Sequence, residues 1–211
     1  MFKVSIIYEG KKTLESIQKE FNNQLSEKEI LKTTAGALNV TARKVLTQVK
    51  KEIKKEGYTI NTKYLNRMAS LSKPAKGTVE GLYARISYSY SPIPMIGFKH
   101  KGEPTKRSKG KRNPIIVEIH KGNPILLRHA WIGTTASGHT GIFAKGMFVK
   151  GQFVKGLKGS NGGTIFEQRS ASPFTMATNK RVEDKIIDNI KGQLPKRLRA
   201  MLQVKINKLT K

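Results

Sequence analysis

Cysteine is absent from this chain of 211 residues, and aspartate occurs only twice. Without cysteine the chain cannot form disulfides, use a thiolate nucleophile, or hold zinc or iron–sulfur clusters through sulfur. Asp184 and Asp188 are four residues apart, and between Gly57 and Val182 the only acids are four glutamates. Two-metal nucleases and polymerases need several carboxylates that converge on Mg²⁺. We therefore expect no such catalytic centre.

Metal-binding and nucleotide-binding patterns are missing as well. The four histidines, none four residues from another, do not have the spacing of a helical zinc site; they are His100, His120, His129 and His139. The pair Gly151 and Gly156 has the spacing of a phosphate-binding loop, but Leu157 and Lys158 follow where Lys and then Ser or Thr are required. We expect no metal, no cofactor and no enzymatic activity.

Long uncharged runs are also absent. The longest, residues 86–98 and 129–144, are shorter than the roughly 20 apolar residues that a membrane-spanning helix needs. We therefore expect no contact with a membrane and a protein made in the cytoplasm.

One histidine has neighbours of a catalytic kind. His139 lies between Ser137 and Thr140, so hydroxyl groups stand on either side of an imidazole. Neighbouring residues in a strand or turn point apart, whereas a nucleophile and its base must come within hydrogen-bond reach. We expect His139 to be a turn residue satisfied by backbone groups.

Positive charge is what the chain has in excess. It carries 41 Lys and Arg against 14 Asp and Glu, a net charge of +27. The segment 99–112 contains seven of these cations, and an imperfect Phe-Val-Lys-Gly repeat adds two. Such a block commonly binds phosphate or an acidic protein face, in a salt-dependent manner. A solvated hairpin tip is the alternative. The candidate contacts are Lys99, Lys101, Lys106, Arg107, Lys109, Lys111, Arg112, Lys150 and Lys155.

The two ends of the chain have helical periodicity. Apolar residues recur at steps of three and four from Ser26 to Gly57 and from Asn179 onward, which predicts two long amphipathic helices. Ser26 and Glu29 form a capping-box pattern. Gly36 predicts a kink or a close helix contact in the first helix, and Pro195 predicts that the second is kinked or divided. A strand at residues 3–8 and a shorter helix at 13–24 are expected before them.

The middle of the chain has the pattern of strands. Strands are predicted at 79–89, 114–120, 129–134 and 140–145, and the Phe-Val-Lys-Gly repeat predicts a hairpin. A short helix capped by Thr62 is expected before them. The chain as a whole predicts one α+β domain over residues 1–211, with a mixed or antiparallel sheet region and extended basic loops. Its parts are a strand plus helices (1–57), a β-rich region (58–170) and a C-terminal helix (179–210).

Three separate segments carry a family resemblance. They are Tyr88-Ser-Tyr-Ser-Pro-Ile-Pro-Met-Ile-Gly-Phe98, Ser137-Gly-His-Thr-Gly-Ile-Phe143, and Ile165-Phe-Glu167 through Ser172-Pro173 to Met176. Together with the long basic helix before them and the Leu- and Arg-rich helix after them, their order resembles the minor tail protein Z family of tailed bacteriophages and prophages, the tail completion proteins. The resemblance spans roughly residues 30–205.

The resemblance implies a non-enzymatic virion protein at the head-proximal end of the phage tail, in the host cytoplasm during assembly. Proteins at that position form homo-oligomeric rings, commonly hexameric, and meet tail tube, tail terminator or head-tail connector proteins. The Pro-bounded apolar residues Ile93, Met95, Ile96 and Phe98 are candidates for the subunit interface, with ordinary core as the alternative.

The net charge leaves two partners open. Because a strongly positive lumen would retard the passage of DNA by Coulomb attraction, we expect the basic surfaces to meet acidic tail or connector proteins, or to hold a DNA end at rest. The alternative function is a basic module that binds DNA or RNA without sequence specificity. The segment 99–112 has no interleaved aromatics, and the chain has no compact helix-turn-helix, so specific readout is not expected.

Overall fold

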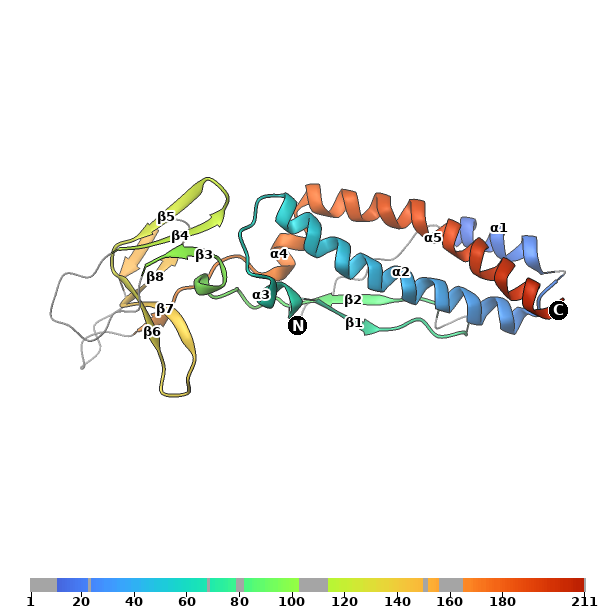
Figure 1. The fold of residues 1–211 in the computed structure, drawn as a ribbon, viewed down its shortest axis with the longest axis horizontal. Coiled ribbons are helices and arrows are strands. Elements are labelled where there is room, and N and C mark those ends of the chain that lie inside the picture. Colours follow the sequence, from blue (N-terminus) through green and yellow to red (C-terminus); the bar gives the residue numbers. More distant parts are fainter. Residues whose placement is uncertain are drawn as a thin grey trace. The chain divides into compact units, whose positions relative to one another are not determined.

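The computed structural model describes residues 11–22, 24–67, 69–78, 82–102, 114–149, 152–155 and 165–210. Helices and small antiparallel sheets together make an α+β fold, as predicted (Figure 1). The sequence predicts one domain, whereas the structure has two compact units. The helical unit comprises the described residues within Met1–Ile53, Met68–Tyr90 and Met176–Lys211, and the β unit those within Lys54–Arg67 and Ser91–Thr175. Each unit draws on segments far apart in the chain, which is why periodicity along the sequence does not reveal the division.

Three helices build the helical unit: α1 (Lys11–Phe21), α2 (Glu27–Lys55) and α5 (Lys180–Leu209). The two long helices confirm the predicted periodicity. Steps of four separate the residues that α5 buries, so they form one stripe along the helix; they are Val182, Ile186, Ile190, Leu194, Leu198, Leu202 and Ile206. Polar contacts flank the packing, including Arg197 Nη1 with Thr41 Oγ1 at 3.0 Å between α5 and α2.

Irregularities in the two long helices are predicted at Gly36 and Pro195. A Cβ added to Gly36 of α2 would lie 3.2 Å from Cε of Met201 in α5, so the predicted close helix contact is confirmed. Pro195 lies inside α5, and the helix continues through it as one element. Of the two predicted alternatives, a kinked or a divided helix, division is therefore wrong. The buried stripe runs through both neighbouring turns, at Leu194 and Leu198, and their packing offsets the lost backbone hydrogen bond.

The start of α2 has the predicted capping box. The Ser26 hydroxyl donates to the Glu29 carboxylate at 2.9 Å and accepts from the Glu29 amide at 3.4 Å. The Ser26 amide donates to the same carboxylate at 3.3 Å. The Ser26 hydroxyl lowers the pKa of Glu29 most, and the Lys205 ammonium, 3.3 Å from Glu29 Oε1, lowers it next. The Glu29 charge therefore stabilises the helix terminus.

The helical unit also contains a two-stranded ladder. Strand β1 (Ala69–Lys73) pairs antiparallel with β2 (Arg85–Tyr88). Of the predicted strand at 79–89, residues 85–88 are confirmed, residues 82–84 are not in a strand, and residues 79–81 lie outside the described residues. The sequence does not predict β1, because its alternation is short and weakly apolar. Asn39 of α2 anchors the chain after β1: its amide group donates to Ala75 O at 2.9 Å and accepts from the Ala75 amide at 2.7 Å.

The β unit contains two three-stranded antiparallel sheets and a hairpin. The first sheet has the order β3 (Lys99–Lys101), β4 (Ile115–His120), β5 (Asn123–Leu127), and the second has the order β10 (Phe166–Glu167), β7 (Thr140–Ala144), β6 (Ala130–Thr134). Strands β8 (Gly146–Val149) and β9 (Gln152–Lys155) form the hairpin, with Phe148 opposite Phe153. The strands predicted at 114–120, 129–134 and 140–145 and the hairpin of the repeat are confirmed.

Short helices complete the fold: α3 (Thr62–Asn66), η2 (Met95–Gly97) and α4 (Pro173–Ala177). The cap of α3 is Asn61, whose side chain accepts from the Lys63 amide at 2.9 Å, and not Thr62 as predicted. Thr62 is already helical, and its hydroxyl accepts from Lys54 Nζ at 2.8 Å. The predicted strand at residues 3–8 lies outside the described residues. Within the described ranges, no helix is long and apolar enough to cross a membrane.

Candidate functional site

The three segments that carry the family resemblance come together in the β unit. The Met95 amide donates to Gln168 O at 2.8 Å, and the Ser170 amide donates to Ile93 O at 2.8 Å, so the Pro-Ile-Pro segment runs beside residues 168–171. The Gln168 amide donates in turn to Ile142 O at 2.7 Å. We call the residues 91–98, 137–143 and 165–172 the motif cluster. Backbone hydrogen bonds thus link its three parts although up to about 80 residues of chain separate them.

The apolar side chains of the cluster are mostly core. Ile93, Met95 and Phe98 are each 3–4% exposed, so the structure does not support them as subunit contacts, and the alternative of ordinary core is correct for them. The 3₁₀ turn η2 explains the difference, since it folds the Pro-bounded segment inward. Ile96 is half-buried and keeps part of its surface. Gly97 allows this packing, because a Cβ there would come 2.9 Å from the ring of Tyr64.

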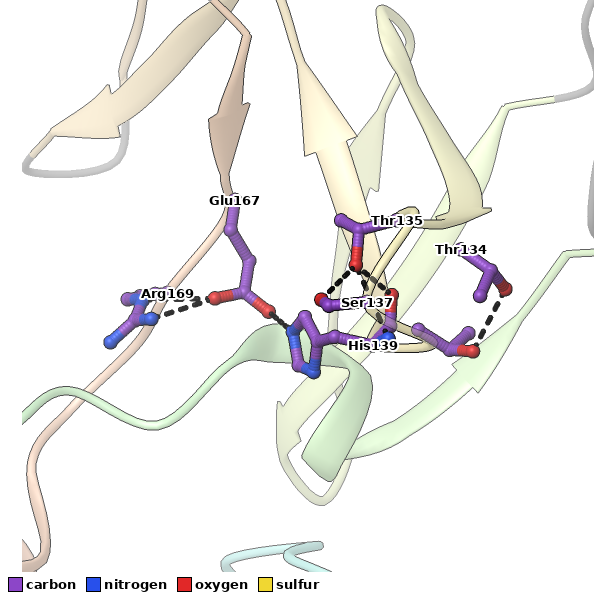
Figure 2. Close-up of polar contacts among 7 residues, drawn as sticks. Thr134, Thr135, Ser137, His139, Glu167 and Arg169 are labelled. Carbon is purple, nitrogen blue, oxygen red and sulfur yellow. Dashed lines mark hydrogen bonds and ion pairs between the residues drawn. The ribbon is translucent and has the colours of Figure 1, made fainter.

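A polar group crosses from β10 to the β6–β7 hairpin (Figure 2). Glu167 Oε1 lies 2.5 Å from Nε2 of His139, and its Oε2 accepts from Arg169 Nη2 at 2.8 Å and Nε at 3.1 Å. The Glu167 side chain is 12% exposed, while those of His139 and Arg169 are about half exposed, at 48% and 49%. The carboxylate is therefore held between two nitrogen groups at the edge of the unit. We call these three residues the His139–Glu167–Arg169 triad.

The hairpin tip beside the triad is bonded to itself. Thr135 Oγ1 contacts Ser137 Oγ at 2.9 Å and accepts from the His139 amide at 3.2 Å, and the Thr135 amide donates to His139 O at 2.8 Å. Thr134 and Thr140 hydroxyls meet at 2.9 Å (Figure 2). Gly138 turns the chain at φ +80°. Residues 134–140 are all exposed, so these bonds order a surface loop.

The environment predicted for His139 is therefore only partly correct. Its backbone is satisfied within the turn, but its ring pairs with a carboxylate that lies 28 residues further along the chain. The hydroxyl of Ser137 bonds to Thr135 and that of Thr140 to Thr134. Neither of the two hydroxyls forms the nucleophile–base pair that acyl transfer requires.

Gly141 makes room for this arrangement. A Cβ at Gly141 would lie 2.8 Å from Glu167 Oε1 and 3.1 Å from the ring of Phe143. Real Cβ atoms do not approach that closely, so a larger residue would displace the carboxylate from His139. The glycine in the Gly-x-Phe part of the second resemblance segment is therefore explained by local steric contacts.

The basic candidates divide between described and undescribed residues. Lys99 and Lys101 lie in β3 and are exposed, and Lys155 lies in β9 opposite Gly146. Lys99 is engaged, because its Nζ lies 2.7 Å from Oε2 of Glu118 in β4. Lys101 makes no ion pair with another residue that the structure describes. The other candidates, Lys106, Arg107, Lys109, Lys111, Arg112 and Lys150, lie outside the described residues.

Glu118 holds one end of the first sheet. Besides the Lys99 ammonium, its carboxylate accepts from the Gly122 amide at 2.7 Å, in the turn between β4 and β5. The Lys99 contact lowers the pKa of Glu118 most, and the Gly122 amide lowers it next. Thr59 joins the same corner, with its hydroxyl on Glu118 O.

Sequence reasoning missed Glu167, Gln168 and Arg169 as site residues. Gln168 is 2% exposed, and its side chain donates to Gly146 O at 2.7 Å and Phe166 O at 3.1 Å. A buried glutamine and a Glu-x-Arg pair leave little trace in a sequence. Only the register of β10 on β7 brings Glu167 to His139.

In the part of the chain that the structure describes, no three His, Asp or Glu side chains lie close enough to hold a metal ion. Comparisons of the chain with protein-family models, with curated proteins and with solved structures give no match.

Proposed function

We propose that the chain is a non-enzymatic tail completion protein of a phage or prophage, related to the minor tail protein Z family. It would act at the head-proximal end of the tail, in tail assembly and in joining the tail to a filled head. The motif cluster carries this proposal. The three segments that resemble this family are hydrogen-bonded to one another in the fold. A chance resemblance of three unrelated segments gives no reason to expect that they lie together.

The proposed working form is a homo-oligomeric ring, hexameric by the family resemblance, with tail tube, tail terminator or connector proteins as partners. Copies that each carry a net charge of +27 repel one another. The surfaces in contact must therefore carry few cations, or pair those cations with acidic residues. The hairpin tip at residues 134–140 fits this requirement. It contains no Lys, Arg, Asp or Glu, it is exposed, and its internal hydrogen bonds order it before contact.

The test uses a phage genome in which this gene is deleted and supplied from a plasmid. Deletion should leave filled heads and free tails as separate particles, and the gene should restore joined virions. Ile96→Asp should prevent that rescue, because it adds a charge at the half-exposed residue of the motif cluster. Val204→Asp, at a 55% exposed residue of α5, is the matched control and should rescue normally. Joined virions in normal number after deletion would contradict the proposal.

A nucleic-acid-binding function predicts a different result. If all cations of segment 99–112 are replaced by Gln, a DNA- or RNA-binding module should lose retention on nucleic acid. Under this nucleic-acid-binding hypothesis, the unmodified protein should bind duplex DNA at physiological salt. A tail protein whose basic surface meets acidic proteins should release duplex DNA at that ionic strength. Binding that survives physiological salt would therefore count against the protein-partner form of the proposal.

A further inference from the structure

A small apolar pocket opens where the chain passes from the first sheet of the β unit to the second. Its volume is about 220 Å³. Its lining comes from the end of β5, the turn after it, the start of β6, the end of β7 and the buried glutamine: Leu126, Leu127, Arg128, His129, Ala130, Ala144 and Gln168. Leu127, Ala130, Ala144 and Gln168 are buried, so they form the floor. Leu126 and Arg128 are exposed and lie at the rim.

The size of the pocket suits one side chain. Drug-sized ligands and cofactors occupy pockets of about 300–1,000 Å³, while a cavity of about 150 Å³ already admits a benzene ring. A pocket between these sizes with an apolar floor fits a single aromatic or large aliphatic group. Leu126, 43% exposed at the rim, would gain from being covered.

A row of side chains leads across one face of the sheet to Leu126 at the rim of this pocket, whereas the floor residue Leu127, opposite Ile115, belongs to the other face. Lys101 of β3 is opposite Ile116 of β4, and Ile116 is opposite Leu126 of β5. Cross-strand partners share one face of a sheet, so the three side chains form a line on the face away from the buried Ile115 and Val117. The line spans two strand spacings, roughly 10 Å. Its order is cation, apolar, apolar, and then the pocket with Arg128.

The line ends in a cation on either side, Lys101 and Arg128. Neither side chain makes a hydrogen bond or ion pair with another residue that the structure describes, whereas Lys99 on the same strand is paired with Glu118. An apolar surface with a cation at each end, on a chain of +27, matches a partner that carries an apolar side chain between acidic residues.

We propose that Lys101, Ile116, Leu126 and the pocket beside Arg128 form a docking surface for an acidic protein segment. The segment places one aromatic or large aliphatic side chain in the pocket and carboxylates against Lys101 and Arg128. This inference rests on the proposed function in one respect: it takes the acidic segment to belong to the tail or connector partner. The anchor would supply most of the affinity, and the two charge pairs would supply orientation and salt dependence.

The direct test is fluorescence anisotropy with the purified full chain and short labelled peptides. The first peptide is rich in Asp and Glu and has one central Phe. The second has Ser in place of that Phe, and the third replaces the acids by Asn and Gln but keeps the Phe. We expect the first to bind at least about tenfold more tightly than either of the others, since anchor and charge are both required. Equal binding of the Phe and Ser peptides would overturn the proposal, as would no binding of the first.

Matched variants separate this surface from the general charge of the chain. Arg128→Glu and Lys121→Glu change the net charge equally, but exposed Lys121 lies at the β4–β5 turn, beyond the far end of the strand from the pocket. We expect R128E to weaken the first peptide by about tenfold or more and K121E by less than about threefold. Leu126→Ser should also weaken it. Equal losses in R128E and K121E would show diffuse attraction only and would refute the site.

The two proposals can fail separately. Peptide binding with the expected pattern, in a protein whose gene deletion leaves joined virions intact, would keep the docking surface and refute the tail function. Failed peptide binding together with loss of joined virions on gene deletion would do the reverse. Circular dichroism and emission of Trp131, the only tryptophan, verify that each variant is folded.

Discussion

The helical unit and the β unit are held together in different ways. In the helical unit, apolar stripes on α2 and α5 bury residues at regular steps, and most of the large side chains that are fully buried in α5 are leucines. In the β unit, tight glycine contacts and side-chain hydrogen bonds fix segments that share no periodicity, as at Gly141, Gln168 and Glu167. We therefore expect the helical unit to tolerate substitutions on its surface and the β unit to be sensitive to substitutions at these few close contacts.

The unfolding of the two units can be followed with different spectroscopic probes. Most helical residues belong to the helical unit, and Trp131 lies in β6 of the β unit. Far-ultraviolet circular dichroism therefore follows mainly the first unit, and tryptophan emission follows the second. Substitutions in one unit should move mainly the probe of that unit.

The largest effect is expected from the core of the helical unit. Leu198 is fully buried in α5, so Leu198→Ala should lower the free energy of unfolding by about 2–5 kcal/mol through lost burial and the cavity left behind. Urea titration followed at 222 nm measures it. Leu209→Ala in the same helix, at a 55% exposed residue, is the control and should change stability by less than about 0.5 kcal/mol. An equal shift of the Trp131 transition in L198A would show that the units unfold together.

The next effect tests the fit of the β unit. Gly141→Ala adds a Cβ 2.8 Å from Glu167 Oε1, and we expect a loss of about 1–3 kcal/mol in the Trp131 transition. Glu167→Ala removes the atom that the new Cβ would meet. The loss caused by G141A should therefore be smaller in the E167A background, which a double-mutant cycle measures. An unchanged loss would mean that the carboxylate yields freely and that the triad does not depend on Gly141.

The same contrast explains what the sequence could predict. The long helices and the strands at 114–120, 129–134 and 140–145 carry their period in consecutive residues, so they were found. The strand β1 has too few apolar positions, and the Asn61 cap competes with an adjacent Thr62 of similar propensity. The triad joins His139 to Glu167 through the register of two strands, which no local pattern encodes. The division into two units arises in the same way, from packing between distant segments.

A smaller effect of opposite sign is expected at Gly192. It lies inside α5, and an added Cβ would meet nothing within 4 Å. Gly192→Ala should therefore stabilise the helical unit by up to about 1 kcal/mol, because alanine loses less backbone entropy in a helix. The transition at 222 nm should move to higher urea while the Trp131 transition stays in place. Destabilisation would mean that Gly192 is needed for a contact that this helix makes elsewhere.

The smallest effect concerns acid. Each unit has a partly buried carboxylate whose pKa is lowered in the folded state, Glu29 chiefly by the Ser26 hydroxyl and Glu118 chiefly by the Lys99 ammonium. Because folding lowers these pKa values, the stabilisation is complete above the ordinary value of 4.5 and is lost as the pH falls through the lower folded value. Glu29→Gln should flatten the acid dependence of the 222 nm transition only, and Glu118→Gln that of the Trp131 transition only. Each variant is the control for the other, since both remove one partly buried carboxylate from the same chain. If either variant flattened both transitions equally, the acid sensitivity would belong to the net charge of the whole chain and not to the two local contacts.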